Sequence, residues 1–220
     1  MPLMLSERPQ KLIPEILDNL PADHPDAVQS RQDIRAFNRA LGNWRWFSKV
    51  LPRRVGPVEK ILEIGAGTGE LCGRIDRHGL WADGLDLAPR PPQFSAARVW
   101  HQTDLFNFKG WADYPVVIGN LFFHHFDSAQ LAELGRHLNQ HARLIVVGDL
   151  RRGRLQQYFF AALARALRAN HVSRHDGWVS VGAGFRGHEL PKMLGLDPKR
   201  WQWKMPAHFF AYRMIAERRS

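Results

Sequence analysis

The sequence predicts an α/β protein built on one seven-stranded, mostly parallel sheet with helices on both faces. Three observations lead to this prediction. Short apolar runs alternate with helical patterns between residues 60 and 170, which is the pattern of β-α-β units. A glycine-rich turn joins the first apolar run to the first helical pattern. Two aromatic-rich runs near the end flank Pro206, which predicts an antiparallel hairpin at one edge of the sheet.

The individual elements follow in chain order. The run KILEIG at 60–65 has the composition of a buried strand, and GELCGRIDRH at 69–78 that of a helix. Further strands are expected at 80–87, 97–105, 114–121 and 142–150, and the final hairpin within 200–216. Further helices are expected at 127–139, 154–170 and near 187–195.

Residues 1–57 are expected to form an N-terminal arm and a helical cover, and residues 58–220 the sheet domain. The arm is rich in proline, and helical spacing of apolar residues begins near Asp26. Gly42 should divide the helical region in two, with Asn43 capping the second helix.

Composition indicates a globular, cytoplasmic protein. Among 220 residues Cys72 is the single cysteine, which excludes a disulfide framework and favours a reducing compartment. No apolar run reaches the roughly 18 residues of a membrane span. The net charge of +10 fits either an anionic partner or a cationic solubilising surface, and no Lys/Arg run interleaved with aromatics resembles a nucleic-acid module.

The stretch LEIGAGTGEL carries the most specific signal. Gly65, Gly67 and Gly69 lie between a strand and a helix, where glycine permits a tight turn and close approach of a ligand. Asp86 ends the next strand, where an acidic side chain can bind a ribose diol. The spacing differs from the dinucleotide pattern, and Glu63 would serve a cationic or amino-acid ligand better than a pyrophosphate.

These motifs resemble those of the class I S-adenosylmethionine-dependent methyltransferases, whose fold is Rossmann-like with an antiparallel C-terminal hairpin. The resemblance implies S-adenosylmethionine as cofactor. It implies that Asp86 binds the ribose, that Asp104 reaches the adenine amine with Leu105 beside the ring, and that Asn120 lines the methionine end. The residues it implies at the cofactor are Glu63, Gly65, Ala66, Gly67, Thr68, Gly69, Asp86, Leu87, Asp104, Leu105, Asn120 and Leu121.

The stretch GNLFFHHFD places His124 and His125 in the loop that faces the methyl group in that fold. A histidine with a pKa near 6.5 suits proton removal from a phenol, so one of the two is the candidate catalytic base. The alternatives are that both only hold the loop, or that they bind a metal together with His101, Asp127 or Asp149. No recognisable metal-ligand spacing links these residues, and no metal is expected.

Other residues are candidates for contact with the acceptor: Asp149, Arg152, Ser180 and Phe185. Asp149 could orient a substrate hydroxyl or cap its loop, and 175–190 is expected to be a glycine-rich loop near the substrate entrance. The arginine-rich helix at 154–170 either covers the sheet or rests on anionic lipid headgroups.

The stretches GNLFFHHF, GDLRRGRL and EILDNLPADHP resemble bacterial methyltransferases associated with type III polyketide synthase and phenolic-lipid pathways. This resemblance implies a small aromatic acceptor, with O-methylation favoured and C-methylation open. The alternative is an RNA or protein methyltransferase that uses the basic surface, although the loop after the fourth strand lacks the proline pair typical of base methylation. A cofactor-binding protein without catalysis is a third class. The sequence gives no oligomeric state.

Overall fold

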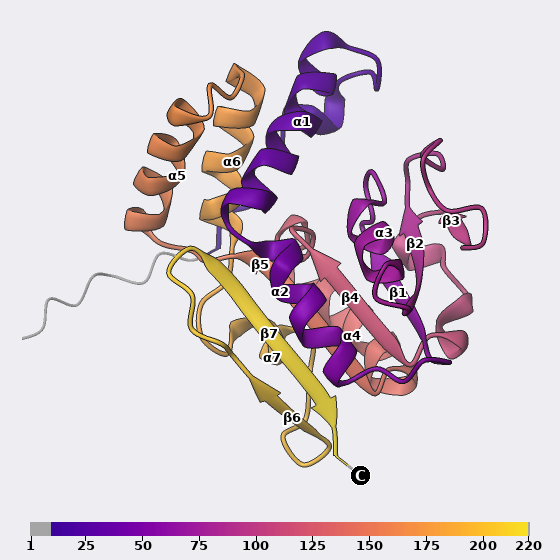
Figure 1. Ribbon diagram of the computed structural model, residues 1–220. Coiled ribbons are helices and arrows are strands. Elements are labelled where there is room, and N and C mark those ends of the chain that lie inside the picture. Colours follow the sequence, from indigo (N-terminus) through magenta and orange to yellow (C-terminus); the bar gives the residue numbers. More distant parts are fainter. Residues whose placement is uncertain (1–9, 220) are drawn as a thin grey trace, which may run out of the picture.

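The computed structural model describes residues 10–219, and its centre is one seven-stranded sheet with the order β3-β2-β1-β4-β5-β7-β6 (Figure 1). The strands are β1 (Lys60–Ile64), β2 (Trp81–Asp86), β3 (Trp100–Gln102), β4 (Val116–Asn120), β5 (Leu144–Leu150), β6 (Trp201–Lys204) and β7 (Ala211–Arg218). β1 to β5 are parallel, and β7 is antiparallel to both β5 and β6. The prediction of a mostly parallel sheet with an antiparallel C-terminal hairpin is therefore confirmed.

Helices cover both faces of the sheet because its strands alternate apolar side chains between them. On one face Ile61 and Val146 pack against α2 (Asn43–Val50) and α3 (Glu70–Asp76). On the other face Leu62 and Val147 pack against α4 (Ser128–His141) and α7 (Glu189–Met193). Short 3-10 helices complete the cover: η2 (Leu51–Arg53), η3 (Leu105–Asn107) and η4 (Gly110–Asp113).

The region expected as an N-terminal cover contributes to the core. Trp44 and Phe47 of α2 are buried with the sheet residues, and the ring of Phe47 lies close to Gly148 of β5. Asn43 does not cap α2: Gly42, at φ 66°, precedes the helix, and the buried Asn43 amide donates to Asn38. The left-handed turn requires a glycine, which explains why the helix begins there.

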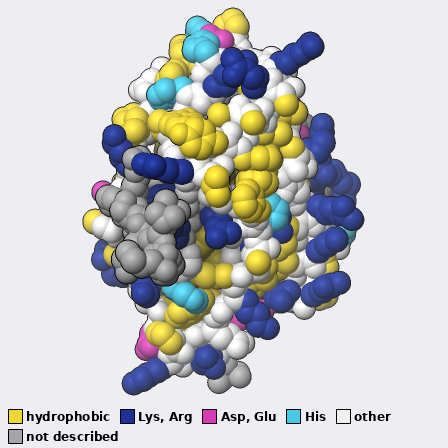
Figure 2. Space-filling model, turned by 90° about the vertical axis from the view of Figure 1, so that its left-hand side faces the viewer, with side chains coloured by type: hydrophobic (Ala, Val, Ile, Leu, Met, Phe, Trp, Pro, Cys, Tyr) yellow, Lys and Arg dark blue, Asp and Glu magenta, His cyan; other side chains and the backbone are white. Residues whose placement is uncertain are grey.

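A separate layer of helices lies at one end of the sheet (Figure 1). α1 (Pro25–Ala40) and α5 (Arg154–Ala166) both pack against α6 (His171–Ala183), while α5 has little contact with the strands. Of the two alternatives for the 154–170 helix, the structure does not support the sheet-covering one, since α5 packs mainly on α6. Its outer side instead forms part of the surface in Figure 2, where hydrophobic side chains gather among Lys and Arg.

The segment 175–190, expected as a loop, is mostly helical, because α6 runs to Ala183. Asn170 begins it by accepting a hydrogen bond from the Ser173 N–H. Gly177 lies directly against the Phe160 ring of α5, so a Cβ at this position would overlap the ring. The glycine that suggested a turn serves close packing of two helices.

No helix among residues 10–219 is both long and apolar enough to cross a bilayer.

Two helical glycines allow a matched test of this packing. A Cβ at Gly135 of α4 would overlap the backbone carbonyl of Leu194, whereas a Cβ at Gly73 of α3 meets nothing within 4 Å. Gly135→Ala should lower the free energy of unfolding by about 1–3 kcal/mol through overpacking. Gly73→Ala should raise it by about 0.5–1 kcal/mol through lower chain entropy. Urea unfolding of both variants measures the two changes in the free energy of unfolding. Changes of the same sign in both variants would contradict the packing described.

Candidate active site

The carboxyl ends of the parallel strands carry most of the residues expected at the cofactor. The strand order reverses between β1 and β4, and in open α/β sheets ligands bind in the crevice at such a point. The glycine-rich turn follows β1, Asp86 ends β2, and Asn120 ends β4. The fold therefore brings together residues that lie far apart in the sequence.

The glycine-rich turn needs its glycines, since Gly65, Gly67 and Gly69 have φ values of 65°, 54° and 69°. Gly67 is exposed, and a Cβ there would meet no atom within 4 Å, so the backbone of the turn is open to a ligand. The Gly67 N–H donates to Asp86 Oδ2 at 2.7 Å, and the Ala88 N–H donates to Asp86 Oδ1 at 2.8 Å. These bonds hold the carboxylate of Asp86 beside the turn.

The remaining residues of the turn support this geometry through the backbone. The Ala66 N–H donates to the carbonyl of Leu85 at 3.1 Å, and the Thr68 carbonyl accepts from Gln93 at 3.1 Å. Leu87, beyond Asp86, is 71% exposed, which leaves its side chain free to cover a ligand. The sequence predicts that Leu87 and the residues of the turn lie near one another, and the fold brings them to the same end of the sheet.

Asp104 and Leu105 follow β3, the neighbour of β2. Asp104 Oδ1 accepts from the Phe106 N–H at 2.8 Å and so caps η3. Leu105 is buried in the core. This arrangement fixes the direction of the Asp104 carboxyl group at the same end of the sheet as Asp86.

Glu63 is buried beneath the glycine-rich turn, with only 3% of its surface exposed. Its Oε2 accepts from the backbone N–H and from the thiol of Cys72, each at 2.9 Å. Burial raises the pKa of Glu63 to about 8, although the bonds from Cys72 act in the opposite direction. Glu63 thus ties the turn to α3, a role that the sequence did not indicate.

Asn120 and Leu121 form the start of the loop after β4. The Asn120 amide donates to Asn38 of α1 at 3.0 Å, while its buried Oδ1 has no hydrogen-bond partner. Leu121 has a φ of 54°, an uncommon conformation for a residue with a branched side chain. A buried acceptor without a partner at this point suits an incoming amino group.

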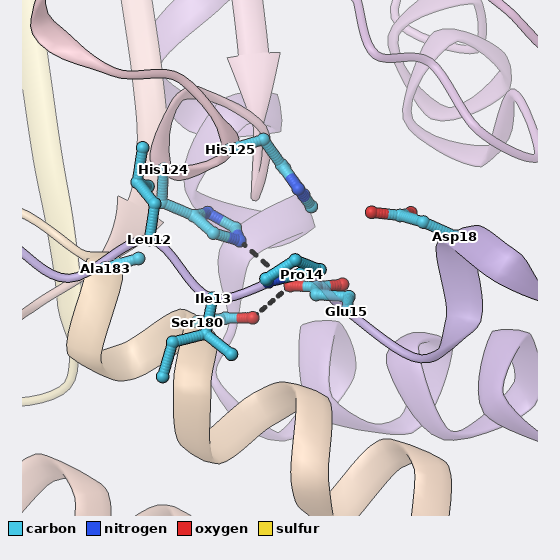
Figure 3. A pocket seen from close by; sticks show the side chains of 9 residues that line it. All are labelled: Leu12, Ile13, Pro14, Glu15, Asp18, His124, His125, Ser180 and Ala183. Atoms are coloured by element: carbon cyan, nitrogen blue, oxygen red, sulfur yellow. Dashed lines mark hydrogen bonds and ion pairs between the residues drawn. The ribbon is translucent and has the colours of Figure 1, made fainter.

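A pocket of about 290 Å³ lies beside this loop (Figure 3). Its walls come from the N-terminal arm, from η5 (Phe123–His125) and from α6. The lining residues are Leu12, Ile13, Pro14, Glu15, Asp18, His124, His125, Ser180 and Ala183. The two histidines of the sequence motif therefore do reach a common cavity.

His124 is 4% exposed and bonded to a buried carboxylate. Its Nδ1 lies 2.6 Å from Asp149 Oδ1, and its Nε2 lies 3.7 Å from Glu15 Oε1. Burial alone would lower the pKa of His124, but the charge and hydrogen bond of Asp149, together with Glu15, raise it to about 10. His124 is therefore an imidazolium between two carboxylates at neutral pH.

His125 has the opposite character. Its ring is open to solvent on one side and points across the pocket toward Asp18 (Figure 3). Burial of the other side of the ring, and then the charge of His124, lower the pKa of His125 to about 4. The ring centroids of the two histidines are 4.3 Å apart, which accounts for the strength of this repulsion. His125 is a neutral imidazole at neutral pH.

The carboxylates of the pocket come from the part of the chain that the sequence predicts to be an irregular arm. Burial raises the pKa of Glu15, but its contacts with His124, His125 and Ser180 outweigh burial and lower it. Burial raises the pKa of Asp18, and so do the charges of Glu15 and Asp176. Asp176 of α6 anchors the arm by accepting from the N–H groups of Ile16 and Leu17, which open η1 (Leu17–Asn19), at 2.8 and 2.9 Å.

The residues expected at the acceptor divide into two groups. Ser180 lines the pocket and donates to Glu15, and Asp149 acts through His124. Arg152 does not line the pocket, because its guanidinium is held by the Gly184 carbonyl and Glu189, each at 2.6 Å. Phe185 is completely buried in the core beside Tyr212. We therefore withdraw Arg152 and Phe185 as acceptor contacts.

Glu15, His124 and His125 place one potential metal-ligand atom each within 4.8 Å of the others. These are the groups that would hold a divalent cation, and His124 already pairs with both Glu15 and Asp149. His101 bonds to Tyr114 at 2.8 Å, and Asp127 caps α4, so neither joins this set.

The lining residues that the sequence did not indicate are those of the arm and Ala183. Glu15 and Ser180 are bonded although they lie 165 residues apart, and no local spacing could indicate that contact. The available signal was the presence of acidic residues at Glu15 and Asp18 between prolines.

Comparison with known proteins identifies the fold. No protein-family model matches the sequence, and no curated protein does. The plantazolicin methyltransferase BpumL, solved with SAH, is 15% identical over 92% of this chain and 93% of its own, with a TM-score of 0.69. The magnesium protoporphyrin IX methyltransferase ChlM from Synechocystis PCC 6803, solved with bound SAM, is 14% identical over 86% of this chain and 84% of its own, with a TM-score of 0.54. The sheet and its covering helices therefore have the Rossmann-like methyltransferase fold.

The buried Glu63 predicts how stability depends on pH. Its folded-state pKa of about 8 lies above the ordinary value of 4.5, so the folded state binds this proton more strongly than the unfolded state. The stabilisation is complete below about pH 4.5 and is lost as the pH rises through about 8. Glu63→Gln should therefore gain stability relative to the original chain over this range.

Urea unfolding at a series of pH values measures this difference. Glu133→Gln on α4 controls for the loss of one negative charge. A Glu63→Gln variant whose stability runs parallel to that of the original chain at every pH would show that Glu63 ionises freely in its site.

Proposed function

We propose that the chain is an S-adenosylmethionine-dependent methyltransferase that methylates a small acceptor in the pocket beside η5. The observation that carries this proposal is the contact of Phe122 with both parts of the site. Its ring lies directly on Gly65 of the glycine-rich turn, and its centroid is 6.2 Å from that of His125. A cofactor bound at the turn would thus have its reactive end next to the pocket.

The residues present fit this cofactor. The exposed backbone of Gly67 and the carboxylate of Asp86 suit a ribose, and Asp104 suits the adenine amine. The unpartnered Oδ1 of Asn120 suits the ammonium group of the methionine part. Solved structures of the same fold that contain SAH or SAM support the assignment.

When bound, S-adenosylmethionine supplies an electrophilic methyl group. The acceptor oxygen would take this methyl group from the sulfur, and the acceptor proton would have to pass to a base of the protein. The protein then has two tasks, which are to align the acceptor with the methyl group and to accept the proton.

His125 is the residue we assign as the base. A base must be unprotonated at the working pH and must reach the acceptor, and His125 is neutral and lines the pocket. Its lowered pKa makes it a weaker base than an ordinary imidazole, so its position beside the acceptor carries the assignment. His124 is held by carboxylates at both ring nitrogens and is protonated at neutral pH. We assign His124 a positioning role, in which it fixes η5 and orients Glu15.

The acceptor we propose is a phenolic or lipid-like aromatic compound that is methylated on oxygen. The pocket volume of about 290 Å³ lies just below the ~300–1,000 Å³ usual for small-molecule sites, which suits a small acceptor. Leu12, Ile13 and Pro14 supply an apolar wall, and Glu15 and Asp18 can accept hydrogen bonds from hydroxyl groups. The sequence resemblance to enzymes of type III polyketide synthase and phenolic-lipid pathways supports the same class.

Cofactor binding tests the first half of the proposal. Asp86→Ala should weaken binding of S-adenosylhomocysteine by roughly 10- to 100-fold, because charge-assisted hydrogen bonds to the ribose are lost. Isothermal titration calorimetry measures the affinity, and Asp113→Ala, an exposed aspartate of η4, is the control. If the original chain binds no S-adenosylhomocysteine, or Asp86→Ala binds it equally well, the assignment of the cofactor site fails.

Methyl transfer tests the second half of the proposal, which is the class of acceptor and the role of His125. The chain is incubated with methyl-labelled S-adenosylmethionine and a cell extract, and the label should partition into the organic phase. With that acceptor, His125→Ala should lower turnover by roughly 100-fold and leave S-adenosylhomocysteine affinity nearly unchanged. His78→Ala, at an exposed site, is the control.

Two results would contradict this half of the proposal. Label that enters RNA or protein would overturn the acceptor class. Loss of turnover on addition of EDTA would indicate that Glu15, His124 and His125 hold a metal ion and that His125 is not the base.

A further inference from the structure

The outer side of α5 presents an unusual set of exposed apolar side chains. Leu155 is 69% exposed and Tyr158 is 65% exposed, and Phe159 follows on the same side of the helix. Phe209, before β7, is 53% exposed, and Trp178 of α6 is 38% exposed. We call these five residues the α5 face. A helix that buries its apolar side in the protein would show the reverse pattern.

Direct contacts join the α5 face into one surface. Phe159 stacks on Phe210 with ring centroids 3.5 Å apart, and Phe210 contacts Phe209 at 4.3 Å. Tyr158 contacts Trp178 at 5.8 Å. The Gln156 amide also donates to the Phe209 carbonyl at 3.0 Å, which fixes the segment before β7 against α5. The surface is therefore held in place by packing before anything binds to it.

The charged side chains of α5 and of the segments directly before and after it all have one sign. Residues 150–175 contain no aspartate and no glutamate. Arg151, Arg154, Arg165 and Arg168 are exposed at the two ends of α5, and Figure 2 shows dark-blue side chains around the hydrophobic ones on this side of the molecule. An apolar strip with arginines at its margins matches the acyl region and the phosphates of a bilayer surface.

We propose that the α5 face is a docking surface for an anionic lipid bilayer, with α5 lying in the plane of the membrane. A second copy of the chain is a poorer occupant, because a two-fold interface would oppose the same arginines of both copies. Lipid phosphates pair with these arginines instead, and the exposed apolar side chains leave water. The proposal depends on the α5 face alone and does not require methyl transfer.

Vesicle flotation with the full chain tests the proposal. The chain should float with vesicles of phosphatidylcholine containing phosphatidylglycerol, and much less with phosphatidylcholine alone. Binding should weaken as salt rises, since exposed charges are screened. The variant Leu155→Ser/Tyr158→Ser/Phe209→Ser should bind at least about tenfold more weakly, because it removes much of the apolar area.

Matched variants separate the α5 face from general effects of hydrophobicity and charge. Val58→Ser/Val99→Ser changes two exposed valines elsewhere and should bind like the original chain. Arg154→Ala/Arg165→Ala should lose binding to anionic vesicles, whereas Arg77→Ala/Arg136→Ala, at exposed sites on other elements, should lose much less. The arginine pair also carries the test if the serine variant fails to fold.

Three results would overturn the proposal: no binding to anionic vesicles, equal binding by the original chain and the α5-face variants, or a dimer that the serine variant abolishes in the absence of vesicle binding. Light scattering gives the oligomeric state for the last comparison.

Discussion

The pairing of Asp149 with His124 is the interaction on which the rest of the site depends. Asp149 lies near the end of β5 with no exposed surface, and an unpaired charge in such a position costs several kcal/mol. His124 is the side chain that meets it, so η5 must fold back over β5. In that position the Nε2 of His124 lies 3.7 Å from Glu15 of the N-terminal arm. One buried ion pair therefore links the loop after β4, the end of β5 and the arm.

The features that the sequence predicted well are those that short-range patterns specify. Buried strands such as Val116–Asn120 are short apolar runs, and the turn after β1 needs left-handed backbone that glycine provides. The strand order then brings Asp86 and Asn120 to the same crevice, because parallel strands share a carboxyl edge.

The features that the sequence could not predict are contacts between distant segments. Nothing local distinguishes Gly177, which lies against Phe160 inside a helix, from a glycine in a turn. Glu15 resembles any acidic residue of a proline-rich arm until Ser180 and His124 approach it. The apolar outer side of α5 is equally ambiguous, since periodicity shows that a helix has two sides and does not show which of them is buried.

The anchoring of the arm by Asp176 has a consequence for the order of folding. The walls of the pocket come from segments far apart in the chain: the bonds from Ile16 and Leu17 of the arm to Asp176 of α6 span 160 and 159 residues. Contacts of such long range cost the most loop-closure entropy before they return any energy. We therefore expect the pocket to be among the last parts of the molecule to assemble. The arm is also a natural unit of partial unfolding, so the interior of the pocket can exchange with solvent while the sheet stays intact.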